Sequence, residues 1–239
     1  MALLPWRKGK VIRIENETAV TKRYWIEVPE LDTFDFIPGQ FVTLDLPIHE
    51  KLNKRMRSYS IASWPDDTNV FELIIVLDKI GAGTNYIFDE VKIGSELVFR
   101  GAQGVFTLKE PIEKDIYLIC TGTGIAPFRS MVQHINSKNI PHKNITLIFG
   151  CRTKDTLLYY DEMKKLETSL AGFTYIPTLS REEWEGRTGY VHSIYEELCN
   201  NKRPAQFLLC GWRGMIDEAK QRILDLGYTD KDIHVEIYG

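Results

Sequence analysis

An apolar strand that runs into a glycine turn at residue 122 constrains the fold of this chain most strongly. The segment Leu118-Ile-Cys-Thr-Gly-Thr-Gly-Ile-Ala-Pro127 carries Gly122 and Gly124 and is followed by a helix-compatible stretch. Such a turn lets backbone approach a pyrophosphate, and the N-terminus of the following helix supplies free N–H groups and a partial positive charge. Because the turn lies at residue 122 of 239, about half of the chain precedes it and is expected to bind something else.

Composition places the chain among globular proteins and excludes several classes. The sequence is 44% hydrophobic and 26% charged, and each half is long enough to bury its own core. A net charge of −3 argues against nucleic-acid binding by electrostatics. No apolar run approaches the roughly 18 residues of a membrane span, and the apolar part of Met1–Arg7 is too short for a signal peptide. We therefore expect a cytoplasmic protein that binds neither nucleic acid nor membrane.

The four cysteines predict no metal site. Cys120, Cys151, Cys199 and Cys210 do not form a close C-x-x-C pattern, which argues against a zinc ribbon or an iron–sulfur cluster. Three of them lie in or beside apolar runs, as reduced and buried thiols do.

The first part of the chain reads as short strands separated by turn residues. Alternating or β-branched segments and one helix-like piece at Thr84–Val91 predict an antiparallel barrel or sandwich. The predicted strands are Lys10–Glu15, Arg23–Val28, Gln40–Leu46, Arg57–Ala62, Val70–Leu77 and Ser95–Arg100.

After about residue 110, strands alternate with helices, which predicts a doubly wound parallel sheet with helices on both faces. Lys109-Glu110-Pro111 interrupts the pattern, so we place the domain boundary there, giving domains 1–110 and 111–239. The predicted strands are Ile116–Cys120, Ile145–Phe149, Phe173–Pro177, Phe207–Cys210 and His234–Ile237, and the predicted helices are Phe128–Ser137, Leu157–Leu170, Val191–Asn200 and Met215–Leu226.

A second set of phosphate-binding features lies in the first domain. Arg57-Ser58-Tyr59-Ser60 offers a guanidinium, two hydroxyls and an aromatic face, and Gly81–Tyr86 opens the predicted helix with glycines. Alone, the tetrapeptide is a weak signal for phosphate binding, because a plain strand with a solvent-exposed Arg is the usual interpretation of such a sequence. Together, the two glycine turns imply two nucleotides, one for each domain.

With these motifs in order, the chain resembles the ferredoxin–NADP reductase family over essentially its whole length. The markers are Arg57-Ser-Tyr-Ser60, Gly83-Thr84, Gly101-Ala-Gln-Gly-Val-Phe106, Gly122-Thr-Gly-Ile-Ala-Pro127, Cys210-Gly211 and Val235-Glu-Ile-Tyr-Gly239. The resemblance implies an N-terminal antiparallel Greek-key β-barrel that binds FAD and a C-terminal α/β domain that binds NADP(H). It also implies a monomer.

The resemblance implies a role for each matched residue of the FAD-binding motifs. Arg57 would hold the FAD pyrophosphate within the motif that includes Ser58. Tyr59 would pack on one face of the isoalloxazine, and Ser60 would hydrogen-bond near flavin N5. Thr84 and the N–H groups after Gly83 would bind the other side of the pyrophosphate.

In the second domain, the resemblance places Gly122, Thr123 and Gly124 under the NADP pyrophosphate and nicotinamide. Cys210 and Glu236 resemble the thiol and carboxylate beside the hydride-transfer site. Tyr238 resembles the terminal aromatic that covers the second flavin face, although Gly239 follows it here. Cys210 at the end of an apolar strand also suits a structural thiol, and Glu236 in an alternating segment also suits a solvent-facing residue.

The choice of nicotinamide cofactor depends on groups around the adenosine 2′-phosphate. Ser180-Arg181 resembles the NADP-reading pair of the family, and Arg152 and Arg187 would converge with it at the carboxyl ends of neighbouring strands. Against this, Glu182-Glu183 and Glu185 suit the ribose hydroxyls of NADH, and Arg187 also suits a solvated loop. We favour NADP(H).

Electrons must leave to a separate partner, because the sequence carries no cluster or haem motif. Lys51, Lys54 and Arg55 precede the flavin motif and would attract an acidic ferredoxin or flavodoxin, although such runs are usually solvated loops. The sequence therefore predicts hydride transfer between NADP(H) and flavin, and single-electron transfer between flavin and ferredoxin or flavodoxin. An NADH-preferring oxygenase reductase component or cytochrome b5 reductase-like enzyme is the alternative, and a non-catalytic electron-transfer subunit ranks last.

Overall fold

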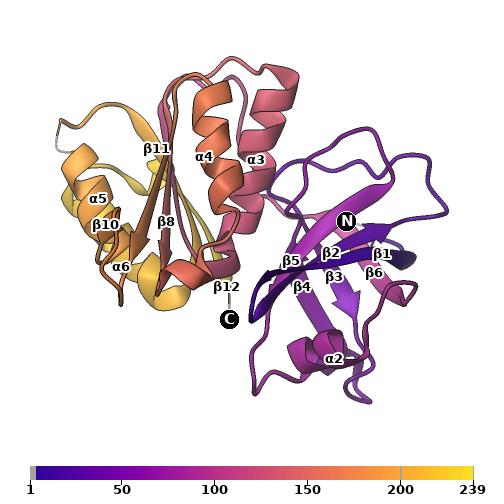
Figure 1. Cartoon of the computed structure of the whole chain (residues 1–239). Coiled ribbons are helices and arrows are strands. Elements are labelled where there is room, and N and C mark those ends of the chain that lie inside the picture. Colours follow the sequence, from indigo (N-terminus) through magenta and orange to yellow (C-terminus); the bar gives the residue numbers. More distant parts are fainter. Residues whose placement is uncertain (1–3, 200, 239) are drawn as a thin grey trace. The chain divides into compact units, whose positions relative to one another are not determined.

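The computed structural model describes residues 4–199 and 201–238 (Figure 1). The chain divides into two compact units. The first comprises Met1–Thr107 together with Arg129–His134, and the second comprises Leu108–Phe128 together with Ile135–Gly239. Helix α3 therefore contributes residues to both units, although each unit has its own sheet.

The first unit is a six-stranded antiparallel sheet that closes on itself. Its strand order is β4-β3-β6-β1-β2-β5, and an antiparallel bridge from Ile61 to Leu73 joins the two ends of that order. Closure in this way removes the unpaired edges and forms the predicted barrel. The strands are β1 (Arg7–Thr18), β2 (Thr21–Glu27), β3 (Phe41–Asp45), β4 (Met56–Ser60), β5 (Val70–Val76) and β6 (Glu96–Gln103), with helices α1 (Leu52–Arg55) and α2 (Ala82–Glu90).

Alternate residues of these strands fill the barrel, as the two-residue period of a strand requires. Tyr24 and Ile26 on β2, and Val42 and Leu44 on β3, are at most 1% exposed. Three phenylalanines form the aromatic part of this core, with ring centroids 4.9–5.8 Å apart: Phe34, Phe71 and Phe99.

The second unit is a six-stranded parallel sheet in the order β10-β9-β8-β7-β11-β12. From β7 the strand order runs outward through β8 in one direction and through β11 in the other, which confirms the predicted doubly wound topology. The strands are β7 (Asp115–Thr121), β8 (Ile145–Cys151), β9 (Phe173–Leu179), β10 (Arg187–Thr188), β11 (Ala205–Trp212) and β12 (Ile233–Tyr238).

Helices cover both faces of this parallel sheet: α3 and α4 lie on one side and α5 and α6 on the other (Figure 1). Ile119 of β7 and Leu209 of β11 pack with Ile194 of α5 and Ile216 of α6 in one buried cluster. The helices are α3 (Ile125–Lys138), α4 (Tyr160–Ser169), α5 (Val191–Leu198) and α6 (Arg213–Asp225), with 3₁₀ turns η1 (Gly122–Gly124), η2 (Lys154–Thr156) and η3 (Asp230–Asp232).

Several predicted boundaries differ from the structure. Strand β10 was predicted as loop, because a two-residue strand carries too little periodicity to recognise. Helix α4 begins at Tyr160 rather than Leu157, because Tyr159 has a left-handed φ of 53°. Helix α3 begins at Ile125 rather than Phe128, since the glycine turn continues directly into it. The predicted end of α5 at Asn200 lies outside the described residues.

Within residues 4–199 and 201–238, no helix is long and apolar enough to cross a membrane. The same residues contain no group of three or more His, Cys, Asp or Glu side chains arranged to hold a metal ion.

Candidate functional site

The first candidate phosphate site joins Arg57 on β4 to the N-terminus of α2. A Cβ atom at Gly83 would lie 3.0 Å from Cγ and 3.1 Å from Nε of Arg57, so glycine is what lets the first turn of α2 lie against this arginine. The helix begins after Gly81 without a side-chain cap. Its first N–H groups therefore need an external partner, and an anion beside Arg57 would supply one.

Arg57 and Thr84 are each tied to the local backbone. Arg57 Nη1 donates to the carbonyls of Lys54 (3.0 Å) and Met56 (2.8 Å), which fixes the guanidinium plane. The Thr84 hydroxyl accepts from the amide of Asp78 and donates within the loop before α2, at 3.0 Å from Asp78 O and 3.2 Å from Gly81 O. Thr84 therefore braces this loop, and the amides that remain for an anion are those in the first turn of α2, because the amide of Asn85 already donates to the carbonyl of Gly81 at 3.1 Å.

Strand β4 presents the remaining residues of the motif on alternating sides. Ser60 is 5% exposed and pairs with Phe41 across the strands. Ser58 is exposed, and its hydroxyl lies 3.0 Å from Thr43 Oγ1. Burial raises the pKa of Tyr59 to about 12 against the opposing charge of Arg57, so this ring stays neutral at physiological pH.

The second candidate site lies at the carboxyl ends of β7 and β11, where the strand order reverses. A Cβ atom at Gly124 would lie 2.5 Å from the carbonyl oxygen of Cys210, so only glycine permits the turn to pass this close to β11. Gly122 has φ +53° with open space around it, and Thr123 is half-buried. Helix α3 follows directly without a side-chain cap, and the amide of Ile125 already donates to the carbonyl of Gly122 within the glycine turn.

Cys210, Glu236 and Tyr238 gather at the same end of this sheet. Cys210 pairs in register with Glu236 on β12 and with Cys120 on β7. Burial raises the pKa of the wholly buried Cys210 thiol well above its usual value, and the charge of Glu236 adds to this rise. The nearby Tyr238 side chain acts in the opposite direction and lowers this pKa. The thiol therefore remains protonated, which fits a packing or hydrogen-bonding group better than a thiolate nucleophile.

The groups predicted to read the cofactor 2′-position come together in part. The amide and hydroxyl of Ser180 both donate to Cys151 O, at 3.0 and 3.2 Å, and the amide of Arg181 donates to Arg152 O at 2.9 Å. Arg152 and Arg181 thus lie side by side at the ends of β8 and β9, both exposed.

Arg187 differs from these two arginines, because its guanidinium forms a two-point ion pair with Glu197. Nη1 lies 2.8 Å from Oε2 and Nη2 lies 3.0 Å from Oε1. A carboxylate of α5 therefore holds this guanidinium, and the convergence of Arg187 with Arg152 and Arg181 stays a prediction.

Two of the three acidic residues that suit NADH form contacts with Lys154. Glu182 accepts the amide of Lys154 at 2.8 Å, and Glu185 lies 2.9 Å from Lys154 Nζ. Glu183 is exposed.

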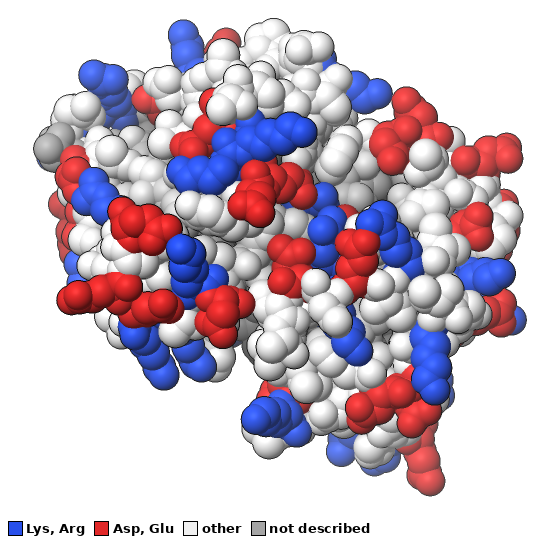
Figure 2. Space-filling model, in the orientation of Figure 1, with Lys and Arg blue, Asp and Glu red and all other residues white. Residues whose placement is uncertain are grey.

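Of the basic residues predicted to attract a partner, Lys51 and Lys54 are exposed. Arg55 is instead paired with Asp45, with Nε 2.7 Å from Oδ1 and Nη2 2.9 Å from Oδ2. On the face drawn in Figure 2, basic and acidic side chains are interspersed.

Sequence reasoning missed two features near these sites. Trp212 and Arg213 follow Cys210-Gly211 at the N-terminus of α6, and Trp212 is 72% exposed while pairing in register with Tyr238. The sequence signal for Trp212 was a large aromatic residue directly after Cys210-Gly211, at the end of β11. The buried pair of Glu72 and Arg129 was also missed, because 57 residues separate the two in sequence.

Comparisons with known proteins identify the family. Residues 8–108 match the oxidoreductase FAD-binding domain and residues 118–221 match the oxidoreductase NAD-binding domain. Ferredoxin–NADP reductase B of Sorangium cellulosum is 33% identical over 241 residues, covering 97% of this chain and 97% of that protein. The anthranilate 1,2-dioxygenase electron transfer component of Acinetobacter baylyi is 28% identical over 205 residues, covering 84% of this chain and only 58% of its own length.

A solved structure shows the same fold. The ferredoxin NADP+ reductase of Neisseria gonorrhoeae, solved with bound FAD and NADP, superposes with a TM-score of 0.82 at 23% identity, covering 97% of this chain and 98% of that one. With full-length identity above 30% to one relative and both domain families matched in order, the chain belongs to the ferredoxin–NADP reductase family of FAD- and NAD-binding oxidoreductases.

Proposed function

We propose that this protein is an NADPH-preferring reductase that exchanges hydride with NADP(H) and passes single electrons to or from a ferredoxin or flavodoxin. The proposed domains are 1–110 for FAD and 111–239 for NADP(H). The proposed partner surface is Lys51 and Lys54 on the exposed segment before β4, with Arg55 orienting that segment through Asp45. We further propose a cytoplasmic monomer, in keeping with four free cysteines.

One observation carries the NADPH preference. Within the described residues, neither the guanidinium of Arg152 nor that of Arg181 has a hydrogen bond or an ion pair, although the two residues are neighbours. The competing carboxylates of Glu182 and Glu185 are already bound to Lys154. Two exposed cations, beside a Glu182 that accepts a backbone amide and a Glu185 that pairs with Lys154, favour a dianionic 2′-phosphate over a ribose hydroxyl.

The proposed residue roles follow from the two candidate sites. Bound FAD supplies a hydride acceptor that can also exchange single electrons. Arg57 and the first amides of α2 would hold its pyrophosphate, while Tyr59 would cover one ring face and Ser60 would hydrogen-bond near N5. Gly122, Thr123 and Gly124 would hold the dinucleotide backbone.

Three residues are proposed to line the reacting end. Cys210 would pack beside the nicotinamide, and Glu236 would carry a proton to or from the site. Tyr238 would cover the second ring face until nicotinamide displaces it. Gly239, which follows it, lies outside the described residues.

The alternative function is an NADH-preferring reductase component of an oxygenase. The similarity to the anthranilate 1,2-dioxygenase electron transfer component favours it, although this chain spans less than two thirds of that relative. Anaerobic stopped-flow reduction with NADPH and with NADH separates the two functions. Faster reduction by NADPH supports the proposal, faster reduction by NADH supports the alternative, and a protein that binds no FAD contradicts both.

Replacing Arg181 by alanine is expected to weaken NADPH binding without affecting NADH. Loss of one charge-assisted hydrogen bond, worth about 1.5–3 kcal/mol, corresponds to a Kd for NADPH raised roughly 10- to 100-fold. The Kd values come from titrations of flavin reduction rate against each nucleotide. Arg187→Ala should have a smaller effect because Glu197 holds that guanidinium, and Lys165→Ala on α4 serves as the matched charge control. Equal losses for NADPH and NADH would remove Arg181 from 2′-phosphate recognition.

Replacing Ser60 by alanine is expected to slow hydride transfer while FAD stays bound. The hydroxyl is buried at the end of β4, and the loss of a positioned proton donor typically costs roughly 100-fold or more in rate. The measurement is the limiting rate of flavin bleaching at saturating NADPH, beside the FAD content from absorbance. An unchanged limiting rate in a fully loaded variant would contradict the proposed role.

A further inference from the structure

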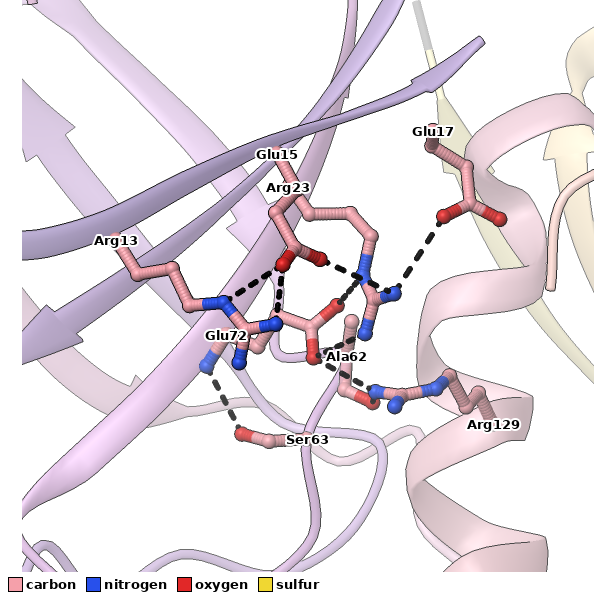
Figure 3. Close-up of polar contacts among 8 residues, drawn as sticks. All are labelled: Arg13, Glu15, Glu17, Arg23, Ala62, Ser63, Glu72 and Arg129. Carbon is pink, nitrogen blue, oxygen red and sulfur yellow. Dashed lines mark hydrogen bonds and ion pairs between the residues drawn. The ribbon is translucent and has the colours of Figure 1, made fainter. Parts of the chain in front are cut away.

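A buried carboxylate on β5 lies between two guanidinium groups (Figure 3). Glu72 is 2% exposed, and its two oxygens receive Arg23 Nε at 2.6 Å and Arg23 Nη2 at 3.2 Å. Arg129 Nη1, on α3, lies 3.0 Å from Glu72 Oε2. Arg129 is itself 4% exposed, and Figure 3 shows both arginines converging on Glu72.

The same two residues fix the backbone that follows the proposed flavin motif. Arg129 Nη1 donates to the carbonyl of Ala62 at 2.8 Å. The amide of Ala62 donates to the carbonyl of Glu72 at 2.8 Å, and the amide of Glu72 donates to Ser63 Oγ at 2.9 Å. Both backbone polar groups of Ala62 are thus held by this pair, and Ala62 lies two residues after Ser60.

Aromatic rings fix the orientation of both guanidinium groups. Arg129 lies 5.4 Å from the ring of Trp64, and Arg23 lies 4.7 Å from the ring of Trp25. Arg13 stacks on Trp25 as well, at 4.4 Å. Guanidinium groups stacked on aromatic faces are shielded from water and held in one orientation, so their hydrogen bonds are directional.

The buried Glu72–Arg129 ion pair fixes positions more precisely than a role in stability alone would need. A buried ion pair is often no more stabilising than apolar residues of similar volume, because both charges lose their hydration. What the pair adds is a fixed distance between Glu72, Arg129 and the Ala62 carbonyl. Functional groups held by locked neighbouring side chains keep the sub-ångström placement that hydride transfer requires.

We propose that Arg129, oriented by Glu72, is a positioning residue that sets the backbone at Ala62 and thereby the placement of the Ser60 hydroxyl. This inference rests on the proposed function in assigning Ser60 to the flavin. Arg129 would act through the Ala62 backbone and not by contact with flavin or nicotinamide. It lies five residues after Gly124, on the helix that begins at the proposed dinucleotide turn.

The first test is amide hydrogen exchange of the purified protein, read by NMR at Ile61 and Ala62. The variants are Arg129→Gln and Glu72→Gln, and the matched control is Lys10→Gln, an exposed basic residue on β1 of the same sheet. We expect exchange at Ala62 to be about tenfold faster in the two test variants and unchanged in the control, because local opening becomes easier. Exchange within twofold of the parent in a folded Arg129→Gln variant would overturn the inference.

The second test separates positioning from general stability. For Arg129→Lys and Arg129→Gln loaded with FAD, we expect a limiting rate of flavin reduction lowered about tenfold or more, since small misplacements have large rate effects. The Kd for NADPH should stay within threefold, and Arg129→Lys should keep more of the rate than Arg129→Gln. A loss that follows melting temperature or NADPH affinity alone would overturn the positioning role. If Arg129→Gln does not fold, Arg129→Lys decides both tests.

The two proposals fail in different ways. A parent protein that neither NADPH nor NADH reduces would overturn the proposed function, and the exchange test would still decide whether Arg129 holds Ala62. A parent that is reduced, beside test variants with unchanged limiting rates, would overturn this inference alone.

Discussion

Replacing Gly39 by alanine is expected to destabilise the protein by about 3 kcal/mol, within the roughly 2–5 kcal/mol that a left-handed backbone cost of roughly 1–2 kcal/mol and an overpacking cost of roughly 1–3 kcal/mol give together. Gly39 has φ +100°, and a Cβ atom there would lie 1.9 Å from the carbonyl oxygen of Phe106. A backbone atom cannot rotate away as a side chain can, so the turn into β3 must shift. Thermal denaturation should show a melting temperature lowered by roughly 6–12 °C.

Gly94→Ala is the matched control for this substitution. Gly94 has a similar φ of +95°, but nothing lies within 4 Å of its Cβ position. Alanine there bears only the backbone cost, so we expect a loss of about 1–2 kcal/mol. The difference between the two variants isolates the close approach to Phe106. Equal losses would show that backbone conformation, and not the contact, decides the requirement for glycine at residue 39.

Replacing Glu72 by alanine is expected to cost about 3–5 kcal/mol, the range measured when one partner of a buried ion pair is removed. The substitution takes the carboxylate away from two guanidinium groups, of which Arg129 is the more buried. Arg23 keeps Glu17 at 3.5 Å, so most of the cost falls on Arg129. The free energy of unfolding from urea titration measures this loss.

Glu218→Ala provides the contrast. Glu218 also joins two basic side chains, His192 and Arg222, but it is half exposed, so its loss should cost less than about 1 kcal/mol. Glu72→Gln, which keeps the size and the acceptor oxygen, should cost less than Glu72→Ala. If Glu72→Ala and Glu218→Ala have the same effect, burial does not determine the strength of the Glu72 cluster.

Much of the fold was predictable because its signals are local. The alternation in Gln40–Leu46 and Val70–Leu77 anticipated β3 and β5, and apolar runs separated by helical patterns anticipated the parallel sheet. The two glycine turns were recognisable for the same reason, since a turn and the helix after it lie within ten residues. Strand β10 and the start of α4 were not, because they depend on pairing with β9 and on the left-handed Tyr159.

The candidate site divides in the same way. Sequence motifs and the family resemblance together predicted Arg57, Ser60, Gly124 and Arg181 as site residues. Whether a charged side chain is free to bind a ligand, however, depends on which other side chains pair with it. Arg187 was predicted beside Arg181 at the cofactor, and Arg55 was predicted in the basic run before the flavin motif; the structure pairs them with Glu197 and Asp45. Each pair joins residues ten positions apart on different elements, from β10 to α5 and from β3 to α1, and such pairing leaves no periodic trace in the sequence.

By itself, the sequence determined two domains, their order, their sheet types and the positions of both glycine turns, because hydrophobic period and turn chemistry act over neighbouring residues. Only the tertiary structure decided which basic side chains form ion pairs and which glycines lie too close to a neighbouring backbone atom to carry a Cβ atom. It also decided that Glu72 is buried between Arg23 and Arg129. The physical reason is that burial, desolvation and ion pairing depend on which distant segments meet, and a linear sequence does not record those meetings.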